Sequence, residues 1–204
     1  TMELGSNAPL IIMEDADLDK VAAATAMTGF ANAGQVCISA QRVLAQELVH
    51  DEFLDRLQTR VEAISTGDQL QEDTGMGPMM RESDAERVND WIQEAVASGA
   101  RLITGGEREG AVIAPAILAD VHPDMKVSRD ELFGPAVAVT SFNDIDQAIS
   151  MANDTRYGLS AAIFTQDIDR ALRFAAEVES GNIHINFGPQ WRADMMPYGG
   201  VKDS

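Results

Sequence analysis

Short apolar runs alternate with segments of helical spacing along most of the chain. Apolar residues recur on one helix face over 18–26, 53–64, 88–96, 145–152 and 168–176. Gly67, Gly99 and Gly181 follow three of these segments, as expected for helix ends. Ser83 and Glu86 have the spacing of a capping box, which predicts that Ser83 caps the third helix.

The predicted strands are continuous apolar runs rather than alternating ones. They cover 10–12, 42–45, 137–139, 161–164 and 183–185, and helical segments separate several of them. Strands buried on both faces have this composition, and parallel neighbours need a crossover helix between them. The pattern therefore predicts an α/β fold with a mainly parallel sheet and helices on both faces. Because no repeat or long linker divides residues 1–204, one domain is expected.

Charge and composition narrow the classes of partner. The 204 residues include 33 acidic and 15 basic ones, for a net charge of −18. Such a chain repels a phosphate backbone, so no nucleic-acid partner is expected. It has no apolar run of 18 residues, so no membrane span is expected either. The single cysteine excludes an internal disulfide and suits a cytoplasmic protein.

The sequence contains neither the residue spacing of a metal site nor the glycine pattern of a dinucleotide-binding site. The histidines His50, His122 and His184 are isolated in the sequence, so no metal site is predicted. The glycines of 75–78 and 105–106 do not complete a G-x-G-x-x-G pattern and are interpreted as turns.

Cys37 is the candidate nucleophile. It follows Asn32-Ala33-Gly34-Gln35-Val36, where Gly34 should break the preceding helix and leave the cysteine on an irregular turn before the strand at 42. Such a turn exposes the sulfur and directs backbone N–H groups at a reacting carbonyl. The alternative is a small buried residue without chemistry, a frequent role of free cysteine.

Five stretches together resemble the aldehyde dehydrogenase superfamily. Glu3-Leu4-Gly5 begins 34 residues (37 − 3) before Cys37, and Gly34-Gln35-Val36-Cys37 is the second stretch. The other three are Glu131-Leu132-Phe133-Gly134-Pro135, Asn153-Asp154-Thr155-Arg156-Tyr157-Gly158-Leu159 and Pro197-Tyr198-Gly199-Gly200-Val201-Lys202-Asp203-Ser204.

This resemblance implies a role for four residues. Cys37 matches the nucleophile and Glu3 the general base, Glu131 the carboxylate that holds the nicotinamide ribose, and Phe133 the aromatic beside the nicotinamide. The implied reaction adds a thiolate to an aldehyde, passes hydride to NAD or NADP, and leaves a thioester that Glu3 hydrolyses by activating water.

The resemblance also implies what lies outside the chain. The family's cofactor-binding domain precedes Glu3, and its final segment, often a strand exchanged between subunits, follows Ser204. Residues 1–204 are therefore expected to be a catalytic domain truncated at both ends, inactive alone, from a homo-oligomeric enzyme.

Arg192 bears on the substrate. The stretch from Arg192 to Gly200 resembles a subgroup that oxidises small anionic or hydroxylated aldehydes, such as lactaldehyde, glyceraldehyde 3-phosphate and phosphonoacetaldehyde. A guanidinium binds such oxyanions through two hydrogen bonds. The alternative is a structural ion pair with Asp194 or another acid. Val36 departs from members with a basic residue before the cysteine, which counts against a phosphate.

Two other functions stay open at this point. A CoA-acylating dehydrogenase would pass the thioester to CoA, but those enzymes generally lack the base that Glu3 represents. A catalytically idle structural or oligomerising module would retain the fold without the reaction.

Overall fold

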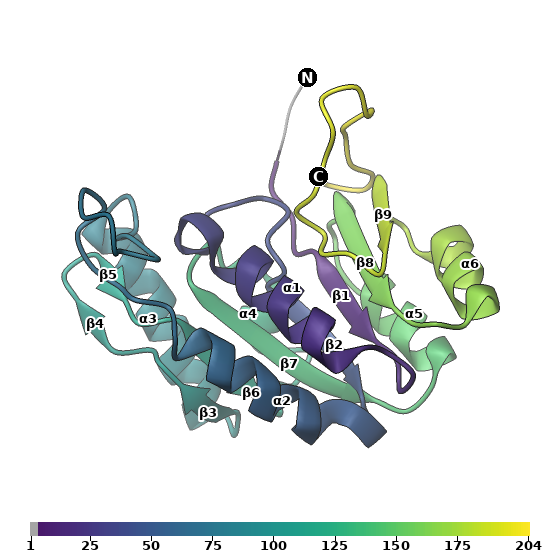
Figure 1. The fold of residues 1–204 in the computed structure, drawn as a ribbon, viewed down its shortest axis with the longest axis horizontal. Coiled ribbons are helices and arrows are strands. Elements are labelled where there is room, and N and C mark those ends of the chain that lie inside the picture. The colour runs from purple at the N-terminus through teal and green to yellow at the C-terminus, as the bar shows by residue number, and fades with distance from the viewer. Residues whose placement is uncertain (1–3) are drawn as a thin grey trace.

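The computed structural model describes residues 4–204 and has a seven-stranded sheet as its centre (Figure 1). The strand order is β3-β6-β7-β2-β1-β8-β9, and every neighbouring pair except β3–β6 is parallel. The strands are β1 (Pro9–Ile12), β2 (Arg42–Gln46), β3 (Arg101–Thr104), β6 (Ala116–Ala119), β7 (Ala136–Phe142), β8 (Ser160–Phe164) and β9 (Asn182–Ile185). The predicted fold class is confirmed, with an antiparallel strand at one edge.

Helices cover both faces of this sheet because side chains of successive strand residues point to opposite sides. Leu10, Ile12 and Val43 pack in the cluster that includes α1 (Leu18–Phe30) and α2 (Glu47–Val61), which lie in front of the sheet in Figure 1. Ile11 and Leu44 pack in the cluster formed with α5 (Ile145–Asn153) and α6 (Ile168–Glu177) on the opposite face. This two-sided burial explains the continuous apolar runs.

Several elements differ from the sequence predictions. The third helix, α3 (Glu82–Ala97), begins after Arg81, and no side chain caps it, so the predicted cap at Ser83 is wrong. The helix begins earlier because the Arg81 carbonyl already accepts the N–H groups of Asp84 and Ala85. The sequence analysis did not predict five elements. They are the strands β3 and β6, the hairpin strands β4 (Arg108–Glu109) and β5 (Val112–Ile113), and the short helix α4 (Lys126–Arg129). None of the helices in residues 4–204 is long and apolar enough to cross a bilayer.

Three of the described candidate residues, Cys37, Glu131 and Phe133, lie at the edge of the sheet where the parallel strands begin. Strands β7, β2 and β1 are neighbours, so the segments that precede them meet at one edge. These segments contain Glu131–Pro135, Cys37 and Ser6. The C-terminal loop returns to the same edge, where the C label lies in Figure 1.

Candidate active site

Cys37 lies on an irregular turn between α1 and β2, as predicted. The chain leaves α1 through the short 3-10 segment η1 (Ala31–Gly34), in which Asn32, Ala33 and Gly34 all have φ between +53 and +68°. The Cys37 turn is closed by a hydrogen bond from Ser39 N–H to the Val36 carbonyl, 2.9 Å long. Cys37 is free and half-buried. Cys37 is therefore not a fully buried residue, and its role as nucleophile stays a prediction.

The turn packs directly on the loop that precedes β7. A Cβ atom at Gly34 would lie 2.0 Å from the carbonyl oxygen of Gly134, so only glycine allows this approach. Gln41 Nε2 donates to the Gly34 carbonyl (3.2 Å), and Gln35 Oε1 accepts from Met80 N–H (2.9 Å). The Cys37 turn and the Glu131–Pro135 loop are therefore fixed relative to one another.

Glu131 is a half-buried carboxylate at this edge. Its Oε1 accepts a 2.9 Å hydrogen bond from Ser6 N–H, and Gly5 lies so close that a Cβ there would be 2.5 Å from Oε2. Burial raises the pKa of Glu131, while the Ser6 bond and the charges of Arg87 and Arg156 oppose that rise. Among residues 4–204, no ion pair holds this carboxylate.

Phe133 belongs to the same loop, two residues beyond Glu131. Its φ of 48° is a left-handed backbone conformation, uncommon for a bulky residue. The side chain is half-buried. The loop thus presents a carboxylate and an aromatic ring next to the glycine that touches the Cys37 turn.

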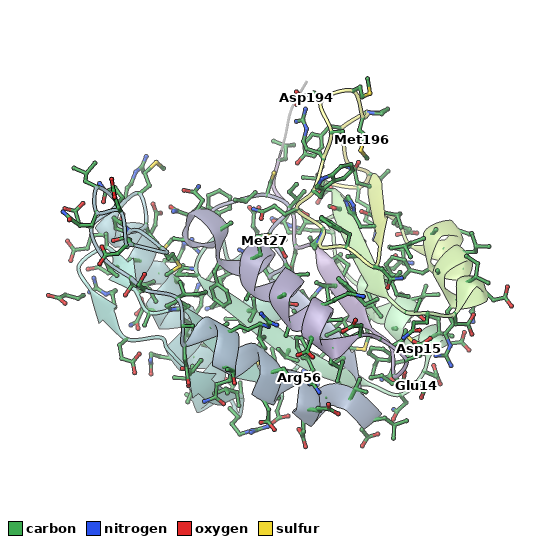
Figure 2. The ribbon with its side chains drawn as sticks, in the orientation of Figure 1. Glu14, Asp15, Met27, Arg56, Asp194 and Met196 are labelled. Atoms are coloured by element: carbon green, nitrogen blue, oxygen red, sulfur yellow. The ribbon has the colours of Figure 1, made fainter. Side chains whose placement is uncertain are left out.

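The side chain of Tyr198 contacts the cysteine sulfur. Its hydroxyl oxygen lies 3.1 Å from Cys37 Sγ, although 161 residues separate the two. The guanidinium carbon of the exposed Arg192 lies 5.1 Å from the centre of the Tyr198 ring. No ion pair joins Arg192 to Asp194 in the described part of the chain; Figure 2 shows Asp194 and Met196 in the loop that projects beyond the sheet.

The loop that carries Arg192 and Tyr198 is held at its C-terminal side. Gly158 O accepts from Val201 N–H (2.9 Å), and Lys202 Nζ donates to Asn153 O (2.8 Å). Ser204 Oγ donates to Gly5 O (2.8 Å). The stretches 153–159 and 197–204 therefore pack on one another and on the segment that precedes β1.

The remaining predicted residues fall into two groups. Glu3 lies outside the described residues. His50 and His184 are buried and His122 is exposed, and residues 4–204 contain no group of three His, Cys, Asp or Glu side chains placed to hold a metal ion.

The sequence analysis missed two contributions to the site. Ser6 acts through its backbone N–H, which no side-chain pattern reveals. Tyr198 belongs to a recognised stretch but was given no role. Its signal was available, because a tyrosine hydroxyl that is partly buried usually finds a hydrogen-bond partner.

Comparisons with known proteins agree with these observations. Residues 1–204 match the family described as "Aldehyde dehydrogenase family". The chain is 45% identical over 204 residues to 3-sulfolactaldehyde dehydrogenase of Priestia megaterium, covering 100% of this chain and 43% of that protein. It is 40% identical over 204 residues to lactaldehyde dehydrogenase of Methanococcus aeolicus, covering 100% of this chain and 44% of that protein.

Solved structures give the same picture. Glyceraldehyde-3-phosphate dehydrogenase of Methanocaldococcus jannaschii, complexed with NADP, superposes with a TM-score of 0.96 at 38% identity. The match covers 99% of this chain and 44% of that one. The chain thus spans less than half the length of the relatives it matches.

Proposed function

Because the chain belongs to the aldehyde dehydrogenase family, we propose that the full-length protein oxidises an aldehyde to a carboxylic acid with NAD or NADP through a thioester on Cys37. The observation that carries the proposal is the position of the sulfur. Cys37 is half-buried on its turn, its Sγ is 3.1 Å from Tyr198 Oη, and the turn packs on the loop of Glu131 and Phe133.

The chain's own residues have two roles in this reaction. The Cys37 thiolate attacks the carbonyl carbon, forming a C–S bond while the carbonyl oxygen takes the negative charge. After oxidation of that carbon, Cys37 carries the acyl group as a thioester. Glu3 then accepts a proton from water as the water oxygen attacks the thioester, and the acid leaves as the thiolate is regenerated.

The loop before β7 fits the nicotinamide end of the cofactor. Glu131 is a half-buried acceptor with no ion pair among residues 4–204, which suits a ribose hydroxyl, and Phe133 provides a ring two residues away. NAD or NADP, when bound, supplies the oxidising power by accepting hydride. The choice between the two would be made by residues that contact the adenosine ribose.

We propose a small, anionic aldehyde as the substrate. Arg192 is exposed, and it stacks on the ring whose hydroxyl contacts Cys37. A guanidinium binds carboxylate, sulfonate or phosphate groups. Two relatives are named for lactaldehyde and for 3-sulfolactaldehyde. Val36 supplies no positive charge beside the cysteine, which favours a carboxylate or sulfonate over a phosphate.

The setting of the enzyme is also a proposal. A catalytic thiol must stay reduced, so we propose that the protein is cytoplasmic. We propose a homo-oligomer because β9 is an edge strand, with Ile185 42% exposed at its end, and an open strand edge is available for pairing with another chain.

The decisive test is Cys37→Ala in the full-length protein. We expect loss of aldehyde-dependent NADH or NADPH formation with little change in unfolding temperature, because the half-buried thiol contributes little packing. Val36→Ala, a truncation in the same turn, is the control and should retain most of the activity. Substantial turnover by Cys37→Ala would show that another group is the nucleophile. An inactive wild-type protein would favour the alternative of a catalytically idle structural or oligomerising module.

The test of Glu3 separates hydrolysis from acyl transfer to CoA. Glu3→Gln should leave the first reduction of the cofactor fast and slow thioester hydrolysis, giving a burst of NADH followed by slow turnover. Glu72→Gln, which changes an exposed acid, should behave as wild type. Unchanged steady-state turnover in Glu3→Gln, or acyl-CoA formation by the wild type, would contradict the hydrolytic assignment.

A further inference from the structure

The protonation state of Cys37 decides which group donates the hydrogen bond between Tyr198 and Cys37. Either atom can donate while the cysteine is a thiol, and the separation of Oη and Sγ is 3.1 Å. Once the cysteine loses its proton, only the phenol has a hydrogen to donate. A hydrogen bond that forms with the charged state of a group favours that state. The geometry therefore supports the thiolate rather than the thiol.

Arg192 adds a positive charge on the same side. Its guanidinium carbon is 5.1 Å from the ring centre, within the range of a cation–π contact. A cation over the ring withdraws electron density from the phenol and makes its O–H a better donor. Arg192 is exposed, so its N–H groups stay accessible to a bound anion while the ring is stacked.

The fold fixes where the phenol can lie. Gly199 follows Tyr198, and its carbonyl oxygen would be 1.8 Å from a Cβ at Gly181, so this backbone is seated against the start of β9. The Cys37 turn is seated independently, by Gly34 against Gly134. Two separately anchored segments thus meet at the oxygen–sulfur contact, which indicates a defined position for both groups.

We propose that Tyr198 is a positioning residue whose hydroxyl donates a hydrogen bond to the Cys37 thiolate, with Arg192 strengthening that donor. This inference rests on the proposed function, in which Cys37 is the nucleophile. When the thiolate attacks a carbonyl carbon, its charge passes to the carbonyl oxygen and the bond to Tyr198 weakens. Tyr198 therefore stabilises the charged sulfur before the attack and lowers its intrinsic reactivity.

The test is the pH profile of iodoacetamide labelling in the full-length protein, with the label located on the Cys37 peptide by mass spectrometry. Tyr198→Phe keeps the ring and its stacking with Arg192 but removes the hydroxyl. We expect the half-maximal labelling rate to move up by about one pH unit, which is about tenfold slower labelling below the midpoint. The plateau rate at high pH should stay the same or rise.

Tyr157→Phe is the matched control. Tyr157 is the other tyrosine of the chain, its ring lies 4.9 Å from the guanidinium carbon of Arg156, and its hydroxyl accepts from Arg156 Nη2 at 2.8 Å. This variant removes a hydroxyl from a similar arginine–tyrosine pair, and its labelling profile should match the wild type. Arg192→Met should move the midpoint in the same direction as Tyr198→Phe by a smaller amount.

The outcomes separate this inference from the function on which it rests. A Tyr198→Phe profile identical to the wild type, or one with a lower plateau and an unmoved midpoint, would overturn the inference even if the wild type oxidises aldehydes. An unmoved midpoint in Arg192→Met would overturn the part assigned to Arg192. The expected shift in a protein that oxidises no aldehyde would support the contact and refute the proposed function.

Discussion

At the scale of single residues, Glu131 shows how one side chain is shaped by its neighbours. The backbone of Ser6 supplies a hydrogen bond, and the absence of a side chain at Gly5 leaves room for the carboxylate. Burial nevertheless dominates and raises the pKa of Glu131 from 4.5. The ionised form is therefore less favourable in the folded protein than in the unfolded chain.

This leads to a pH prediction for Glu131→Gln. A carboxyl group with a raised folded pKa stabilises the fold fully below its unfolded pKa and loses that contribution as pH rises through the folded value. Glutamine does not titrate, and its carbonyl oxygen can still accept from Ser6 N–H. The unfolding temperature of Glu131→Gln minus that of the wild type should therefore increase as pH rises from about 4 to 7.

Thermal unfolding of both proteins across this pH range measures the difference. Glu72→Gln, which changes an exposed glutamate, should show no such trend. A difference that is constant, or that falls with rising pH, would mean that hydrogen bonding and nearby charge outweigh burial at Glu131.

At the scale of elements, one close approach, that of Gly34 to Gly134, determines the backbone conformation of the segment between α1 and β2. Three consecutive residues, Asn32, Ala33 and Gly34, adopt left-handed backbone conformations. A left-handed conformation costs an L-residue about 1–2 kcal/mol. The segment keeps this conformation because the packing of Gly34 on Gly134 and the bond from Gln41 fix it.

The matched pair Gly34→Ala and Gly110→Ala tests this account. The two glycines have φ of +68° and +58°, but a Cβ at Gly110 would meet nothing within 4 Å. Gly110→Ala should cost about 1 kcal/mol in unfolding free energy, from its backbone conformation alone. Gly34→Ala should cost clearly more and should slow labelling of Cys37, because the new Cβ displaces the turn. Chemical denaturation and iodoacetamide labelling measure these effects; equal costs would refute the role of the close approach.

At the scale of the whole molecule, the proposed function leads to a prediction about cofactor binding by residues 1–204. It spans 43% of 3-sulfolactaldehyde dehydrogenase of Priestia megaterium and has no G-x-G-x-x-G pattern. In the proposed function, Glu131 and Phe133 contact only the nicotinamide end of the cofactor. We propose that the groups that bind the pyrophosphate and adenosine lie outside residues 1–204.

We therefore expect residues 1–204, expressed alone, to show no calorimetric binding of NAD at millimolar concentration, whereas the full-length protein binds it. Iodoacetamide labelling of Cys37 in the shorter protein, with a pH profile like that of the full-length one, would show that its site is folded. Tight NAD binding by residues 1–204 would place the main cofactor contacts in this part of the protein.

The sequence by itself determined the class of fold and the position of the cysteine turn. Period and burial pattern are local properties, so continuous apolar runs separated by amphipathic helices suffice for a two-sided parallel sheet. A glycine after a helix likewise predicts a break, but the break comes before Gly34, because α1 ends at Phe30 and the left-handed backbone begins at Asn32. The resemblance of five stretches to a known family was also contained in the sequence, and residues 1–204 match that family.

Only the tertiary structure decided which of those stretches touch. The order of the strands is set by packing between distant segments, and it brings Ser6, Cys37 and Glu131 to one edge of the sheet. The 3.1 Å contact of Tyr198 with Cys37 joins two residues that are 161 positions apart in the sequence, so it depends on how the C-terminal loop folds back onto the Cys37 turn. The antiparallel pairing of β3 with β6 depends on the same non-local packing, because no local pattern distinguishes it.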